Sequence, residues 1–256
     1  MLIKKLLISF FSLMPFVTRA QQPAAPPRDT SFTTMRAYAL EQPNYPFIKI
    51  ANPPTPAEIQ VQESLAYNDT GVRHLYLDIY YPSRKKKEKY PGVLLIHGGG
   101  WRSGDKSQML PIAQQLAAHG YVAAAAEYRL SPEALYPAAI HDLKAAVRWM
   151  RANHVEYNLD ENRIVAFGCS AGGQLAALLG TTNGHPEFEG NGGNQNQSST
   201  VQAIIDVDGI LAFRHPESEE GKSAIGWLGG TYEEKPLLWE EASALTHVNK
   251  NTPPML

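Results

Sequence analysis

The chain has 256 residues, a formal net charge of −2, and a hydrophobic content of 43%. This length and composition suit one domain with a sizeable apolar core. The near-neutral charge excludes functions that depend on a strongly basic surface, such as binding to nucleic acid or to an anionic membrane. The one basic cluster, SRKKKEK at residues 83–89, is interpreted as a solvated loop or hairpin.

The first twenty residues have the pattern of a secretory signal peptide. Lys4 and Lys5 precede an apolar run that ends at Val17, and Ala20 stands at the expected cleavage site. The apolar run is too short for a comfortable membrane span. No cysteine stands near the cleavage site to carry a lipid. We therefore expect a periplasmic or extracellular protein without a stable membrane anchor.

Strand and helix patterns alternate after a weakly patterned N-terminal region. Residues 21–70 are rich in Pro, Gln and Thr, so we expect a flexible leader and then an irregular arm. Strand patterns occupy residues 72–82, 93–96, 121–130, 163–168 and 201–213. Helix patterns occupy residues 107–120, 136–153, 170–180 and 238–248. The alternation predicts one α/β domain at residues 71–256, with a doubly wound, mostly parallel sheet and helices on both faces.

The turn at residues 168–172 carries the candidate nucleophile. Its sequence, Gly-Cys-Ser-Ala-Gly, fits the G-x-S-x-G nucleophile elbow and lies between a strand pattern and a helix pattern. Ser170 would project above the carboxyl end of the sheet, where the N-terminus of the helix stabilises a developing oxyanion. Cys169, the only cysteine, is an alternative nucleophile. A small packed residue is the favoured interpretation, because Ser170 holds the centre of the motif.

A second glycine motif, HGGGW at residues 97–101, directly follows the strand pattern at 93–96. Glycines let backbone N–H groups turn toward a site without obstruction by side chains. We therefore expect an oxyanion hole formed by the N–H groups of Ala171 and of Gly99 or Gly100. A plain glycine turn is the alternative. No cluster of His, Cys and carboxylate residues has metal-ligand spacing, so no metal or organic cofactor is implied.

With these motifs the chain resembles the α/β-hydrolase superfamily, and within it the secreted bacterial esterases related to feruloyl and acetyl-xylan esterases. The matching stretches are HGGGWRSGDKS, EYRLSPEALYPAAIHDLKAAVRWMRAN, GCSAGGQLAALLG and ASALTHV…TPPML. The resemblance extends over roughly residues 72–256. It implies a serine esterase that acts on an acylated plant-polysaccharide fragment through an acyl-enzyme.

The resemblance also implies roles for residues around the motifs. His97 is expected to brace the oxyanion loop rather than act as a base. Trp101 is expected either to line the acyl pocket or to pack in the core. Asp142 fits a buried structural carboxylate at least as well as a catalytic one. Apart from the resemblance, the sequence of residues 213–239 is itself interpreted as a lid or cap over the site.

The catalytic base and acid are the missing parts of this pattern. The order in the α/β-hydrolase fold is Ser, acid, His, and the resemblance places the last two beyond residue 256. We therefore expect the chain to be C-terminally truncated. The later histidines, His185, His215 and His247, are interpreted as surface or packing residues. Asp208, at the end of a strand pattern, is the fallback acid.

Two other functions stay open at this point. A serine peptidase of the prolyl-oligopeptidase type shares the elbow and the fold, although the HGGGW loop favours an esterase. A non-catalytic hydrolase-like binding protein would keep the pocket without turnover, which fits the missing acid and base.

Overall fold

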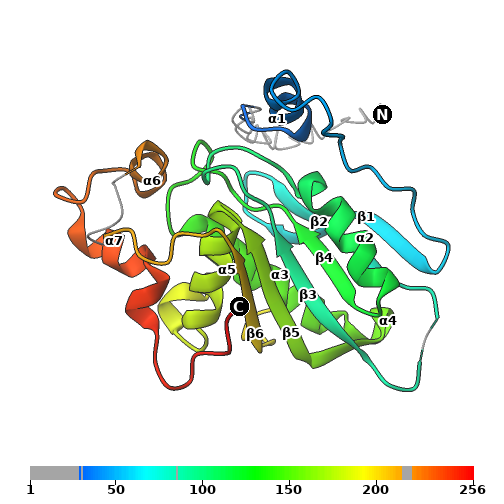
Figure 1. Ribbon diagram of the computed structural model, residues 1–256. Coiled ribbons are helices and arrows are strands. Elements are labelled where there is room, and N and C mark those ends of the chain that lie inside the picture. Colours follow the sequence, from blue (N-terminus) through cyan, green and yellow to red (C-terminus); the bar gives the residue numbers. More distant parts are fainter. Residues whose placement is uncertain (1–28, 30, 85, 215–220) are drawn as a thin grey trace, which may run out of the picture.

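A six-stranded sheet forms the centre of the protein. The computed structural model describes residues 29, 31–84, 86–214 and 221–256. The strands are β1 (Ile59–Asp69), β2 (His74–Pro82), β3 (Tyr90–Ile96), β4 (Val122–Ala126), β5 (Leu159–Cys169) and β6 (Ala203–Val207), in the order β1-β2-β4-β3-β5-β6. β2 is antiparallel to both neighbours, and β4, β3, β5 and β6 run parallel. This mixed, mostly parallel sheet confirms the predicted fold class (Figure 1).

Helices cover both faces of the sheet, which explains the continuous apolar runs of the central strands. Alternate residues of a strand point to opposite faces. Leu94 and Ile96 of β3 therefore join the core beneath α3 (Ala138–Ala152) and α5 (Ala171–Thr181). Val93 and Leu95 join the core beneath α2 (Leu110–Ala118). Every residue of β4 is buried, and its four alanines let the helices approach closely.

The remaining elements are short. They are α4 (His154–Tyr157), α6 (Lys222–Leu228) and α7 (Pro236–Ala242), with 3-10 turns η1 (Lys106–Met109), η2 (Pro186–Phe188) and η3 (Ala244–His247). Residues 254–256 extend the parallel pairing beyond β6, because the Ile204 N–H donates to Pro254 O at 3.0 Å and the Leu256 N–H donates to Ile204 O at 3.0 Å. In the described ranges, no helix has the length and apolar content needed to cross a membrane.

The region at residues 21–70 differs from the expected leader and irregular arm. The signal-peptide pattern and residues 21–28 lie outside the described residues, but the rest contains α1 (Thr34–Glu41) and the edge strand β1. The sheet thus begins at Ile59, before the predicted domain boundary. The pairing of β1 with β2 shifts between Gln62 and Leu65. This irregularity and the half-exposed edge position explain why β1 does not have a clear strand pattern.

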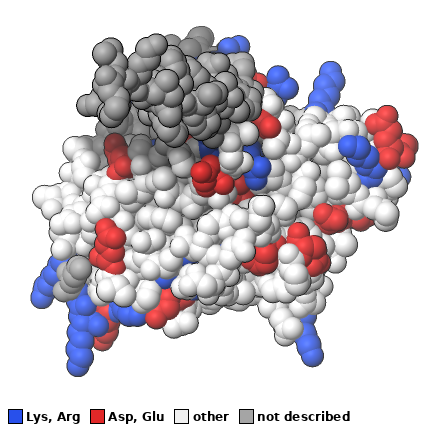
Figure 2. All heavy atoms as spheres, turned by 180° about the vertical axis from the view of Figure 1, so that it is seen from behind, with Lys and Arg blue, Asp and Glu red and all other residues white. Residues whose placement is uncertain are grey.

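Acidic and basic side chains are interspersed on the face of the molecule shown in Figure 2. Charged residues also lie inside. Arg129 donates to both oxygens of Asp142, at 2.8 Å each, and the Asp142 side chain is fully buried. Asp142 therefore has the structural role that was one of its two expected roles. Lys144, two residues further along α3, is also fully buried.

Lys144 gives the stability of the fold a specific dependence on pH. Its Nζ donates to Thr182 O at 2.8 Å and lies 3.5 Å from Glu189 Oε1. Burial lowers the pKa of Lys144 to about 8, from an ordinary value of 10.5. Between about pH 8 and pH 10.5 the Lys144 amine is protonated in the unfolded chain and neutral in the folded protein. The free energy of unfolding therefore rises with pH across this range.

We expect the free energy of unfolding to rise with pH, relative to a Lys144→Met variant, by on the order of 3 kcal/mol between pH 8 and pH 10.5. The comparison with the variant cancels the other titrating groups. Urea unfolding of both proteins across that range measures the difference. Parallel stability profiles would contradict the lowered pKa.

Candidate active site

Ser170 lies at the turn between β5 and α5. Its backbone angles, φ 54° and ψ −122°, belong to a sparsely populated region that a non-glycine residue adopts only when the surrounding structure holds it there. The Ser170 N–H donates to Val207 O at 2.7 Å, which ties the turn to the end of β6. The strand-turn-helix arrangement of the elbow motif is therefore present, with Ser170 at its apex.

Close backbone contacts explain why the elbow needs small residues. A Cβ atom on Gly172 would lie 2.2 Å from Ile96 O and 2.6 Å from His97 O. A Cβ atom on Gly168 would lie 1.9 Å from Gly172 O. The first turn of α5 therefore rests directly on the carboxyl end of β3, where the second glycine motif begins.

The glycine loop after β3 folds back on itself beside Ser170. Gly99 has φ 127°, and its carbonyl oxygen accepts hydrogen bonds from the N–H groups of Arg102 and Ser103, at 3.1 Å and 3.0 Å. Within the described part of the chain, the N–H groups of Gly99 and Gly100 donate to no backbone carbonyl. Ala171 is the first residue of α5, so its N–H has no partner within the helix. These N–H groups are the candidate oxyanion donors.

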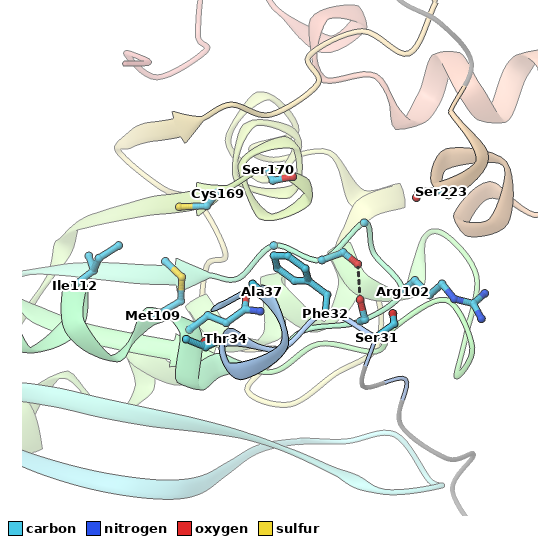
Figure 3. A pocket seen from close by; sticks show the side chains of 15 residues that line it. Ser31, Phe32, Thr34, Ala37, Arg102, Met109, Ile112, Cys169, Ser170 and Ser223 are labelled. Carbon is cyan, nitrogen blue, oxygen red and sulfur yellow. Dashed lines mark hydrogen bonds between the residues drawn. The ribbon is translucent and has the colours of Figure 1, made fainter. Parts of the chain in front are cut away.

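A cavity of about 580 Å³ contains both motifs (Figure 3). Its lining residues come from the glycine loop, the elbow, α2 with the turn before it, α6, and the N-terminal region. They are Ser31, Phe32, Thr34, Ala37, Gly98, Gly99, Gly100, Arg102, Ser103, Gln108, Met109, Ile112, Cys169, Ser170 and Ser223. The glycines, Cys169 and Ser170 belong to motifs recognisable in the sequence, whereas no sequence signal marked the N-terminal lining residues.

Cys169 lines the same cavity, but its surroundings disfavour the reactive thiolate. Burial raises the pKa of the Cys169 thiol, and the nearby Asp206 carboxylate raises it further. A higher pKa lowers the fraction of thiolate, which is the reactive form of cysteine. The environment therefore favours Ser170 as the nucleophile, and Cys169 as the small neighbour that the turn requires.

His97 supports the glycine loop from beneath. Its side chain is fully buried, and its ring stacks on Tyr128 with 4.4 Å between ring centroids. Its Nδ1 lies within hydrogen-bond distance, 2.8 Å, of Gly98 O, and the Tyr128 hydroxyl donates to His97 O at 2.9 Å. This geometry fits a bracing role.

Trp101 packs in the core instead of lining the cavity. It is 4% exposed and stacks on Trp227 of α6 with 4.9 Å between centroids. Its Nε1 donates to Gln174 Oε1 of α5 at 3.0 Å. Trp101 therefore joins the glycine loop, α5 and α6. Of its two expected roles the structure favours packing, and the expectation of a substrate-binding side chain is not met.

No histidine lines the Ser170 cavity among the residues that the structure describes. His185 Nδ1 lies 3.3 Å from Glu187 Oε1, and His247 Nε2 lies 2.8 Å from Glu241 O. Their rings pack together, with 5.9 Å between centroids, as packing residues do. His215 lies outside the described residues.

The two carboxylates at the end of β6, Asp206 and Asp208, have different surroundings. Asp206 Oδ1 accepts from the Gly209 N–H at 2.8 Å and stands where a Cβ atom on Gly173 would be, so it supports the packing of β6 on α5. Asp208 follows β6 with φ 62° and is exposed. It does not line the cavity. Across the described ranges, no group of three or more His, Cys, Asp or Glu residues is arranged to hold a metal ion.

We expect Gly172→Ala to destabilise the protein by about 2 kcal/mol or more, because a methyl group there overlaps two backbone oxygens that cannot move without displacing β3. Gly226→Ala is the matched control, since a Cβ atom at this position in α6 meets nothing within 4 Å. Denaturant midpoints measure both. Equal stability of the two variants would contradict the close approach of α5 to β3.

Comparisons with known proteins agree with this geometry. The BD-FAE family model matches residues 77–256. Esterase LipC from Mycobacterium tuberculosis is 30% identical over 186 residues, which cover 70% of this chain and 46% of LipC. A bifunctional GH43-CE structure from Bacteroides eggerthii has a TM-score of 0.69 and 30% identity, over 76% of this chain and 30% of that chain. A truncated form of carbohydrate esterase from gut microbiota has a TM-score of 0.65 and 26% identity, over 77% and 75%.

The chain thus spans about half the length of LipC. The family match extends over most of the chain, from within β2 to Leu256, and includes the elbow and the glycine loop. The chain belongs to the BD-FAE family of α/β-hydrolase esterases, which are carboxylic ester hydrolases.

Proposed function

We propose that the protein hydrolyses esters of acylated carbohydrates, such as acetyl or feruloyl esters of plant polysaccharide, with Ser170 as the nucleophile. One observation carries the proposal: Ser170, directly before α5, lines the same cavity as the loop of Gly98, Gly99 and Gly100. Similarity to a carbohydrate esterase from gut microbiota supports a carbohydrate ester as the substrate.

In the proposed reaction the Ser170 oxygen attacks the ester carbonyl carbon and gives up its proton to a general base. The carbonyl oxygen becomes an oxyanion, which the N–H groups of Ala171 and of Gly99 or Gly100 stabilise. The bond to the alcohol then breaks, and the alcohol leaves with a proton. Water attacks the remaining acyl-enzyme and releases the acid.

We propose that the base and its acid partner belong to a part of the whole protein outside the residues described here. The cavity wall contains no histidine in the described ranges, and the matched region covers only 46% of LipC. Without a base, serine hydrolases lose on the order of 10⁴–10⁶ in rate. The same observation supports a second candidate function, a hydrolase-like binding protein that retains the pocket without turnover.

We expect a fluorophosphonate to modify the 256-residue chain slowly and at Ser170 alone. The adduct should be absent from Ser170→Ala and should remain in the matched neighbour variant Cys169→Ala. Intact-protein and peptide mass spectrometry locate the adduct. A Ser170→Ala chain that is still modified would contradict Ser170 as the nucleophile. Fast modification that His185→Ala or His247→Ala abolishes would contradict a base outside the described residues.

We also propose that the protein is exported. Support comes from Lys4, Lys5, the apolar run that follows, and Ala20 at the expected cleavage site. Expression in a bacterial host, followed by N-terminal sequencing of the periplasmic fraction, is expected to give Gln21 as the first residue. Retention of Met1 in the cytoplasmic fraction would contradict export.

A further inference from the structure

The Ser170 cavity has an outer wall that the proposed mechanism does not use. Four of its lining residues, Ser31, Phe32, Thr34 and Ala37, come from the segment just before and within α1. We call residues 31–37 the N-terminal arm. In Figure 1, α1 lies apart from the sheet and its flanking helices. It lies beyond the strand ends that lead into the glycine loop and the elbow. The arm thus contributes lining residues from outside the α/β layers.

The arm is tied directly to the oxyanion loop. Asp29, just before the arm, accepts a hydrogen bond from Arg102 Nε at 2.7 Å, and Arg102 follows the glycine motif in the chain. Asp29 also accepts from the Ser31 N–H at 2.8 Å. Thr33 then caps α1 by accepting from the Arg36 N–H at 3.2 Å. These contacts hold Phe32 at the cavity although no residue of α1 is buried.

Part of the cavity wall is apolar, although Ser31 and Thr34 of the arm also line the cavity. Phe32 and Ala37 line it together with Met109, the last residue of η1, and Ile112 of α2. In Figure 3 Phe32 lies between the side chains of Met109 and Arg102. The Phe32 side chain is 44% exposed, so the protein leaves much of the ring in water. Covering such a surface with a hydrocarbon group of a ligand is favourable.

The cavity is also larger than the volume that a small acyl group occupies. Its volume of about 580 Å³ lies in the range of pockets that enclose ligands of many non-hydrogen atoms. An acetyl group next to Ser170 would leave the apolar wall uncovered. A longer hydrocarbon group has contacts available on Phe32, Met109 and Ile112.

We propose that Phe32 is a specificity-determining residue, and that its ring forms with Met109 and Ile112 a subsite for an apolar group of the ester that is larger than a methyl group. This inference rests on the proposed function, because it places the ester carbonyl at Ser170. It adds a role for a segment that neither the elbow nor the oxyanion hole requires.

Binding is measured without turnover, in the Ser170→Ala background, so that the test does not depend on a base. The probes are methyl hexanoate and hexyl acetate, which carry a long chain on opposite sides of the ester, and methyl acetate, which lacks it. Ligand-observed NMR gives each Kd. Adding Phe32→Ala is expected to raise the Kd of one or both long esters about tenfold. The Kd of methyl acetate is expected to change less than twofold.

Phe47→Ala is the matched control, because Phe47 follows the arm, is 79% exposed and does not line the cavity. It is expected to leave every Kd unchanged. Thermal unfolding checks that the variants stay folded. An unchanged Kd for both long esters in Phe32→Ala, or no binding of either to the parent, would overturn the inference. Neither result bears on Ser170 as nucleophile, which the fluorophosphonate adduct tests separately.

Discussion

The candidate site depends on one contact between two backbones, the first turn of α5 against the carboxyl end of β3. At Gly172 there is no room even for a methyl group, because the carbonyl oxygens of Ile96 and His97 stand where a Cβ atom would be. β3 continues into the glycine loop, and α5 begins one residue after Ser170. The contact therefore sets the distance between the nucleophile and the loop N–H groups. A side chain at this point would separate the two halves of the site.

This contact must also hold Ser170 in an unfavourable conformation. Backbone strain of that kind costs about 1–3 kcal/mol. All eleven residues of α5 are buried, so the helix cannot rotate to relieve the turn without exposing its core contacts. The hydrogen bond from Ser170 N–H to Val207 O fixes the other side of the turn. The buried helix thus offsets the strain, and the strain keeps the hydroxyl projecting from the turn.

The sequence predicted the central strands and the helices that pack on them, and missed the N-terminal elements α1 and β1. β3, β5 and α5 are marked by apolar runs that end at glycines, and these signals depend only on neighbours in the chain. α1 has a Thr33 cap, a local signal that was available, but it buries no residue and so has no apolar stripe. The role of Trp101 was not predictable, because an indole suits a pocket wall and a core equally. Its partner Trp227 lies on α6, far along the chain.

The stability of the fold and the shape of the cavity depend on different contacts. The arm is joined to the oxyanion loop through Asp29 and Arg102, and the Arg102 side chain is 65% exposed. Ion pairs exposed to this degree contribute little to stability. The arm can therefore change its residues or its position at small cost to the sheet, while the packing of α5 on β3 keeps Ser170 and the glycine loop together. The groups proposed to react and the residues proposed to select the ester are therefore held in place by different contacts.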